Sequence, residues 1–454
     1  MTDPAELVER IWERDPTVWT GHDEAQWLGW LDEPLRMRER LEELNGLAAE
    51  AGDGAEDVVL LGMGGSSLAP EVLRRAFGRD RFHVLDTTHP KAIRRLAGSL
   101  DLGRTLFVVS SKSGGTLETR SHFDFFWEKG GKRGARFVAI TDPGSPLETL
   151  ARERGARVFA GEPTIGGRYS ALSPFGVVPA ALMGVDLRRL LDRAEETLNA
   201  CRVAEDNPGL ELGLALGESW QEGRDKVVIT PNPHGFGLWV EQLLAESTGK
   251  QGRGLVPAPD ESPDGADRQA REVELADPYD LGAEFFRWEF ATAVAGAILE
   301  INPFDQPNVQ EAKDRTTEIL AGRGRGSAPE ARPEGTVEEL LAQARPGDYV
   351  AIQAFVDPAE EERLRPFVER VRAATDCVVT FGLGPRYLHS TGQLHKGGAP
   401  IGCFLQVVDD TGEELAIPGR KFGFARLVRA QAEGDFAALK ERGRPVARIR
   451  LEDI

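Results

Sequence analysis

The chain has 454 residues, which is too long for one compact core, so two domains are expected. Hydrophobic residues make up 41% and charged residues 28%, as in ordinary globular proteins, while the net charge of −19 argues against a nucleic-acid-binding surface. The three cysteines have no C-x-x-C spacing, and no apolar run reaches membrane-spanning length. We therefore expect a cytoplasmic protein with no disulfide framework, no cysteine zinc site, and no nucleic-acid or membrane partner.

The first segment, residues 1–54, is predicted to form polar helices with apolar positions at helical spacing. Four tryptophans fall in it: Trp12, Trp19, Trp27 and Trp30. Large aromatic side chains on short helices are more often packing anchors than a ligand cage. The segment is therefore expected to pack on a larger body.

Strands and helices alternate through residues 55–205. Strands are predicted at residues 58–61, 82–85, 106–109, 137–140 and 158–160. Repeated strand–helix units indicate an open, mostly parallel sheet with helices on both faces. In such sheets, ligands bind at the carboxyl ends of the strands.

A second α/β unit is predicted over residues 206–420, so that the fold class is α/β with two units of similar type. Its strands are expected at residues 227–230, 349–355, 378–381 and 404–408, and helical segments at about 236–249 and 282–300. Residues 251–274 and 321–335 are rich in Gly, Pro and charged residues, which predicts exposed, mobile connections. Residues 421–454 are predicted to form a helical or extended tail.

Two Ser/Gly turns follow strands of the first unit and could hold an anion. Residues 62–67 read GMGGSS and residues 110–116 read SSKSGGT, and a helix is predicted after each turn. Backbone N–H groups, hydroxyls and a helix N-terminus together suit one compact phosphate monoester. The first turn fits neither a dinucleotide fingerprint nor a Walker A loop, and the alternative reading of the two turns is a pair of ordinary structural turns.

Three further polar stretches contain candidate catalytic residues, and each residue could instead have a purely structural role. Arg168 follows two glycines and alone would be read as a surface residue. Glu246 could be a general base on a helix face with Gln242 and Lys250, or it could form a solvated pair with Lys250. His389 could be an acid or base, or it could cap its loop; its six-residue spacing from His395 does not fit a zinc helix.

Taken in order, six motifs resemble the glucose-6-phosphate isomerase family, a pair of sugar-isomerase (SIS) domains with flavodoxin-like sheets. The motifs are GMGGSSLAP, SSKSGGTLET, GGRYSALS, AESTGK, NPFDQP with the later EAK, and LHSTGQ. They span roughly residues 57–410. The segment HSTGQLHKGG is most similar to the isomerase half of bacterial transaldolase/glucose-6-phosphate isomerase fusions.

The resemblance implies reversible isomerisation of glucose 6-phosphate and fructose 6-phosphate without a cofactor or metal, in a homodimer with a shared site. It implies catalytic roles for Glu246 as the base, Arg168 at the enediolate, and Lys313 with His389 in ring opening. It implies contacts with the substrate and its phosphate by Gly65, Ser66, Ser111, Lys112, Ser113, Thr116, Gln242 and Gln306.

Two departures from the family pattern and three rival functions accompany this prediction. The His389 motif follows the NPFDQP segment instead of preceding it, and Gly114 and Gly115 stand where many relatives have bulkier residues. The rivals are an enzyme of neighbouring specificity (an isomerase that also accepts mannose 6-phosphate, or an amino-transferring synthase), a non-catalytic SIS sugar-phosphate sensor, and a structural partner subunit that has lost activity. A synthase would need a glutaminase domain with an N-terminal Cys, and a sensor usually carries a basic DNA-binding domain.

Overall fold

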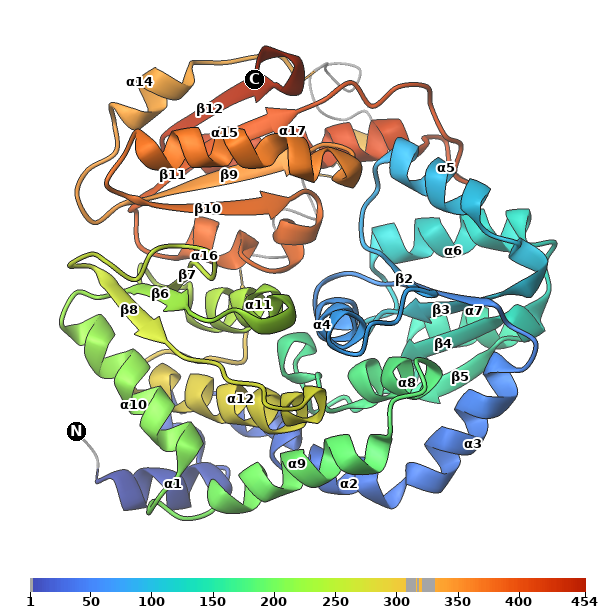
Figure 1. Cartoon of the computed structure of the whole chain (residues 1–454), viewed down its shortest axis with the longest axis horizontal. Helices are drawn as coiled ribbons and strands as arrows, with labels where there is room; N and C mark the ends of the chain where they lie inside the picture. The colour runs from blue at the N-terminus through green and yellow to red at the C-terminus, as the bar shows by residue number, and fades with distance from the viewer. Residues whose placement is uncertain (1–2, 308–315, 317, 321–330) are drawn as a thin grey trace.

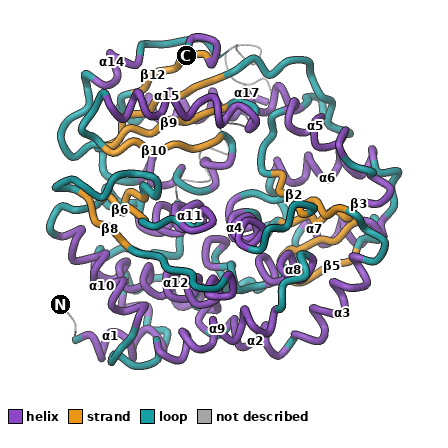
Figure 2. Tube along the Cα trace, viewed as in Figure 1, coloured by secondary structure: helices purple, strands orange, loops and turns teal. Residues whose placement is uncertain are grey.

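Parallel sheets flanked by helices form the framework of the chain (Figures 1 and 2). The computed structural model describes residues 3–307, 316, 318–320 and 331–454. Within those residues the strands form three sheets, of five, four and three strands, and every strand pairing in them is parallel. No described helix is both long enough and apolar enough to span a bilayer.

The five-stranded sheet has the order β2-β1-β3-β4-β5. Its strands are β1 (Asp57–Leu61), β2 (Phe82–Leu85), β3 (Thr105–Ser110), β4 (Phe137–Thr141) and β5 (Arg157–Ala160). Alternate residues of the fully buried β3 enter two separate cores, because successive side chains of a strand point to opposite faces. Helices on both faces therefore cover this sheet, as the sequence predicted.

The helices around this sheet are divided between its two faces. Those of the first unit are α4 (Leu68–Ala76), α5 (Pro90–Ser99), α6 (Leu117–Lys129), α7 (Pro146–Glu153) and α8 (Pro174–Leu182). α4 and α8 share a core with Leu106, whereas α5, α6 and α7 share one with Phe107. The strand order reverses between the neighbours β1 and β3, so the turns that follow these two strands lie side by side, where such folds bind ligands.

The second half contains two sheets where the sequence predicted one. The strands β6 (Lys226–Ile229), β7 (Val256–Pro257) and β8 (Arg268–Arg271) form the smaller sheet, in the order β7-β6-β8. The strands β9 (Tyr349–Phe355), β10 (Val378–Leu383), β11 (Gly402–Val408) and β12 (Val446–Arg450) form the larger one, in the order β10-β9-β11-β12. β7 and β8 cover both edges of β6, so no edge of β6 is free to pair with β9.

The prediction of an exposed, mobile connection is wrong in part for residues 251–274, and residues 321–330 of the other predicted connection lie outside the described part of the chain. Residues 251–274 contain β7 and β8, and Leu255, Val256 and Val273 are buried. These strands were not predicted because β7 has only two residues, one of them proline, and β8 has the mostly polar sequence RQAR. Residues 421–454, predicted to form a helical or extended tail, contain a helix (Phe424–Glu441) and β12, and β12 pairs with β11 along the larger sheet.

Helices surround the sheets of the second half as well. They are α9 (Leu187–Ala200), α10 (Pro208–Gln221), α11 (Gly237–Thr248), α12 (Leu281–Ile298), α14 (Val337–Leu341), α15 (Glu361–Ala373), α16 (Gly392–Gly397) and α17 (Phe424–Glu441). Figure 1 places α11 between the smaller sheet and α4 of the first unit. The predicted domain boundaries at residues 54, 205 and 420 stay predictions.

The N-terminal segment packs its tryptophans on the rest of the chain. It contains α1 (Pro4–Trp12), α2 (Glu33–Glu39) and α3 (Leu41–Gly52). Trp30 stacks on Tyr169 with ring centroids 5.3 Å apart, and Trp19 meets Phe304 edge to face at 5.0 Å. The indole N–H of Trp19 donates to the carbonyl of Ala293 at 2.8 Å. These rings therefore support the backbone beside Arg168 and the NPFDQP segment.

Candidate active site

Glycines bring the first Ser/Gly turn against two distant segments. Gly64 has φ +57°, and a Cβ there would lie 2.7 Å from the carbonyl oxygen of His389 and 3.0 Å from Nε2 of Gln242. A Cβ on Gly65 would overlap the carbonyl of Gly167. Only glycine allows this approach, so Gly65 has a packing role besides the predicted contact with phosphate. The buried Ser66 ends the short helical turn that begins at Gly64.

Residues 110–116, here called the hydroxyl turn, join β3 to α6. The Ser111 hydroxyl donates to Oγ1 of Thr116 at 3.0 Å, and the Gly115 N–H donates to Oγ of Ser113 at 3.3 Å. Gly114 has φ +65°. Thr116 occupies the N-cap of α6 without a side-chain capping bond, so the first N–H groups of this helix are available to an anion.

The side chain of Lys112 bonds to groups within the protein. Its ammonium pairs with Asp142 and lies 3.3 Å from the carbonyl oxygen of Pro163. Burial raises the pKa of Asp142, although Lys112 opposes the shift. Lys112 can therefore contribute a backbone N–H to the hydroxyl turn, while its charge is already partly neutralised.

Glu246 lies buried on α11, one helical turn after Gln242. The amide Nε2 of Gln242 donates to Oε2 of Glu246 at 2.9 Å and to the carbonyl of His389, also at 2.9 Å. The other amide atom of Gln242, Oε1, is buried and has no hydrogen-bond partner among the described residues. Gln242 thus orients the carboxylate and retains an acceptor that a ligand hydroxyl could fill.

Arg168 is 1% exposed and is held from three sides. Its Nε donates to Oγ of Ser247 at 2.7 Å, and its Nη2 donates to the carbonyl oxygens of Pro303 and Asp305 at 2.7 and 2.9 Å. Its Nη1 donates to Oε1 of Gln306 at 3.2 Å and lies 3.5 Å from Glu246 Oε1. A planar guanidinium fixed in this way presents positive charge beside a buried carboxylate.

His389 forms a pair with a residue that sequence reasoning missed. Its Nε2 lies 2.8 Å from Oε1 of Glu118, in the first turn of α6 immediately after the hydroxyl turn. Glu118 also accepts a hydrogen bond from Nε2 of Gln431 on α17 at 2.7 Å. If His389 donates from Nε2, its Nδ1 is an acceptor. Lys313, the predicted partner of His389, lies outside the described residues.

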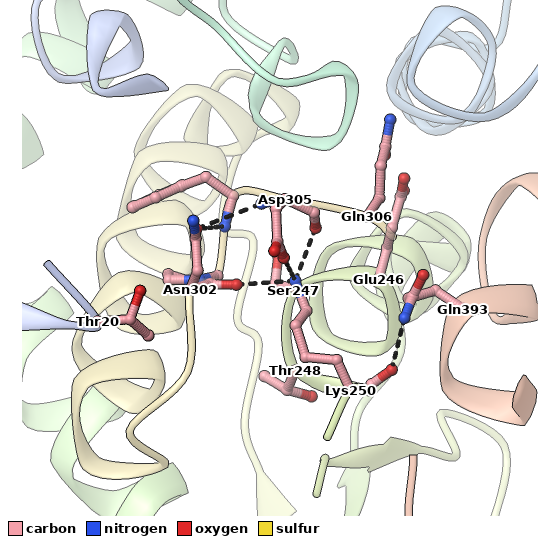
Figure 3. A network of polar contacts seen from close by, with 12 residues as sticks. Thr20, Glu246, Ser247, Thr248, Lys250, Asn302, Asp305, Gln306 and Gln393 are labelled. Carbon is pink, nitrogen blue, oxygen red and sulfur yellow. Dashed lines mark hydrogen bonds and ion pairs between the residues drawn. The ribbon is translucent and has the colours of Figure 1, made fainter. Parts of the chain in front are cut away.

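The structure corrects the predicted helix face of Gln242, Glu246 and Lys250. α11 ends at Thr248, so Lys250 lies beyond the helix and contacts residues 302–305 instead of Glu246 (Figure 3). Both side chains are buried, so they do not form the solvated pair that was the structural alternative.

A chain of contacts connects the hydroxyl turn to Glu246. Glu118 follows the turn and bonds to His389, whose backbone bonds to Gln242, and Gln242 in turn bonds to Glu246. Arg168 and Gln306 close the other side. Of the predicted site residues, Lys313 alone cannot be located, while the described ones fall on these connected segments. No group of residues able to ligate a metal is found in the described part of the chain.

The chain is similar to known sugar-phosphate isomerases. The family model described as phosphoglucose isomerase matches residues 33–251. A probable glucose-6-phosphate isomerase of Haloarcula marismortui is 28% identical over 400 residues, which cover 86% of this chain and 82% of the relative. Glucose-6-phosphate isomerase of Thermus thermophilus is 41% identical over 197 residues, which cover 42% of this chain and 47% of the relative.

Several curated relatives are matched over 42 to 50% of their own length, whereas the glucose-6-phosphate isomerase of Carboxydothermus hydrogenoformans, 28% identical, is matched over 86% of its length. Among solved structures, a glucose-6-phosphate isomerase from Chlamydia trachomatis aligns with a TM-score of 0.54 and 21% identity, covering 70% of this chain and 78% of that one. At this identity the likeness shows the fold, which is the SIS fold that the motifs predicted.

Proposed function

We propose that this chain is a glucose-6-phosphate isomerase, an enzyme that interconverts glucose 6-phosphate and fructose 6-phosphate. One observation carries the proposal: the Glu246 carboxylate lies beside the fixed guanidinium of Arg168, and contacts through Gln242 and His389 link it to Glu118, which follows the hydroxyl turn. Similarity to glucose-6-phosphate isomerases supports it. An aldose–ketose isomerisation needs a phosphate handle, a base and a positive group for oxyanion charge, and all three residue types are present.

In the proposed reaction, the substrate phosphate binds to the hydroxyl turn and Ser66, and this contact positions the sugar chain. His389, oriented by Glu118 and assisted by Lys313, moves the proton that opens the ring. Glu246 removes the proton from C2 of the open-chain aldose, and Arg168 stabilises the negative charge that develops on O1. Glu246 then returns the proton to C1, while a proton moves from O2 to O1 to give the ketose.

The rival functions use the observed geometry less completely. A sugar-phosphate sensor needs the hydroxyl turn, but it does not need a buried carboxylate beside a guanidinium that donates four hydrogen bonds to the protein. An isomerase that also accepts mannose 6-phosphate shares every group named above, so the assay must include that sugar. We also propose a cytoplasmic homodimer most similar to the isomerase half of transaldolase/glucose-6-phosphate isomerase fusions.

The test measures turnover of fructose 6-phosphate, glucose 6-phosphate and mannose 6-phosphate by the wild-type chain and by Glu246→Gln. We expect turnover of the first two sugars, a kcat lower by about 10²- to 10⁴-fold in the variant, and nearly unchanged substrate binding measured by calorimetry. Near-normal turnover in Glu246→Gln would remove the assigned base.

Glu241→Gln is the matched control on the same helix. Burial and the charge of Asp260 raise the pKa of Glu241 to about 8, so at pH 7 this carboxyl is mostly protonated and an amide resembles it. Glu241 and Glu246 lie on different sides of α11, because five residues correspond to about 500° of helical rotation. The control should therefore turn over at the wild-type rate.

A further inference from the structure

Lys250 is a buried cation that the proposed reaction does not use. Its side chain is 1% exposed, and its ammonium donates to the carbonyl oxygens of Asn302 at 2.8 Å and Asp305 at 2.6 Å. It also donates to Oδ1 of Asp305 at 2.6 Å. Figure 3 shows this nitrogen among the oxygens of the two residues. An ammonium has three protons, so the three contacts use its full donor capacity.

The segment that Lys250 binds is also bound by Arg168. The carbonyl of Asp305 accepts from both cations, and that of Pro303 accepts from Arg168. Within the segment, Oδ1 of Asn302 accepts from the N–H groups of Phe304 and Asp305 at 2.9 and 3.3 Å. We call Arg168, Lys250 and residues 302–306 the cation clamp, because two cations hold one turn of backbone.

The cation clamp determines where the reactive groups lie. The carbonyls of residues 303 and 305 fix Nη2 of Arg168, which leaves Nη1 facing Glu246 and Gln306. Lys250 ties the same turn to the end of α11, the helix that carries Glu246. Loss of the ammonium would release one side of the turn and, with it, the carbonyls that orient Arg168. A misplacement of about 1 Å can cost about 10²-fold in rate.

We propose that Lys250 is a positioning residue, which holds residues 302–305 against α11 and thereby keeps Arg168 and Glu246 in register for proton transfer. It acts through Arg168 and does not touch the substrate. The inference rests on the proposed isomerase function.

The charge of Lys250 makes this role dependent on pH. Burial lowers the pKa of Lys250 to about 8, and the charge of Arg168 adds to the shift. The charges of Asp305 in the turn and Glu246 on α11 oppose this lowering of the pKa. The polar neighbour from α16 is Gln393, which is uncharged and donates to the Gly249 carbonyl. Below pH 8 the ammonium keeps its three bonds, and above pH 8 it loses a proton and its ion pair. The isomerase should therefore lose activity as the pH rises through about 8.

The experiment measures kcat and KM for fructose 6-phosphate from pH 6 to 9.5 in the wild type, Lys250→Met and Asp305→Asn. Lys250→Met should lower kcat by about 10- to 100-fold at pH 7, leave KM within about twofold, and abolish the alkaline decline near pH 8. Asp305→Asn removes a charge that stabilises the ammonium, so its alkaline decline should move to lower pH. Lys440→Met, at an exposed position on α17, is the matched control and should behave as the wild type.

The outcomes separate this inference from the proposed function. An inactive wild type would overturn both. An active wild type would overturn the inference alone if Lys250→Met matched its kcat, or if the variant lost rate but kept the same alkaline decline, since that would indicate a merely structural lysine. Should Lys250→Met show no cooperative thermal melt, the Asp305→Asn profile decides: a decline moved to lower pH supports the inference, and an unmoved one contradicts it.

Discussion

The two sides of the candidate site differ in how many of their polar groups are already bonded within the protein. On one side, the hydroxyl turn has an uncapped helix N-terminus and the exposed hydroxyl of Ser113. On the other side, the cation clamp satisfies the guanidinium of Arg168 and the ammonium of Lys250 with protein oxygens. The first side offers donors to a ligand, and the second holds its charges in fixed positions before any ligand arrives.

This difference separates binding from chemistry within one site. A phosphate can complete the unfilled bonds of the hydroxyl turn, which favours affinity. A fixed guanidinium needs no reorganisation when charge develops next to it, which favours the transition state. Substitutions on the clamp should therefore lower kcat, whereas substitutions in the hydroxyl turn should raise KM.

Arg168→Lys should have the largest effect of the three substitutions that follow. A lysine cannot reach Ser247, the two backbone carbonyls and Glu246 together, so we expect kcat to fall by about 10²- to 10³-fold with little change in KM. Steady-state kinetics at pH 7 measure it, with Arg193→Lys on the exposed face of α9 as control. A rise in KM alone would break the proposed division between the two sides.

Glu118→Gln should have an intermediate effect, since it lies where the two sides meet. The amide can still accept from Nε2 of His389, but it carries no charge to stabilise a protonated imidazole. Partners that orient a metal-bound histidine typically contribute about 10- to 100-fold, and because Glu118 orients His389 in the same way we expect a loss of about 10-fold in kcat. Glu128→Gln, exposed on the same helix, is the control, and equal rates in the two variants would refute a role for Glu118.

The smallest effect is expected from Ser113→Ala in the hydroxyl turn. One lost hydrogen bond costs about 1 kcal/mol, which corresponds to a rise in KM of about fivefold with kcat almost unchanged. Inhibition by inorganic phosphate should weaken in parallel, because it reports the same anion contacts. Ser99→Ala, at an exposed position on α5, serves as control. A fall in kcat without a change in KM would contradict the assignment of the hydroxyl turn to substrate binding.

The sequence predicted the first sheet and its turns well because their signals are local. Each of its strands is a short apolar run followed by Gly, Ser or charged residues, and each was found within one residue of its predicted limits. The smaller sheet was missed because β8 consists mainly of polar residues, which form a strand by pairing with the buried β6. Pairing between distant segments leaves no periodic pattern in such a short strand.

The sequence predicted which residues form the site more completely than it predicted the polar contacts between them. Glu118 belongs to the quoted motif SSKSGGTLET, yet an acid in the first turn of a helix is explained equally well by the helix dipole. Lys250 was predicted to share a helix face with Glu246 from their spacing of four residues. This prediction is wrong because α11 ends two residues before Lys250. In both cases the deciding partner, His389 or Asp305, is more than 50 residues away, and sequence spacing carries no information about it.

The bond between Asn302 and Asp23 connects residues 279 positions apart, and the bond from Trp19 to Ala293 connects residues 274 apart. A ribosome adds about 5 to 20 residues per second, so the first segment waits roughly 15 to 60 seconds for these partners to be synthesised. During that interval Trp19 has no native surface to cover it and is open to chaperones and proteases. The support of the NPFDQP segment therefore cannot form until Asn302 has been translated, although its other half lies among the first 23 residues of the chain.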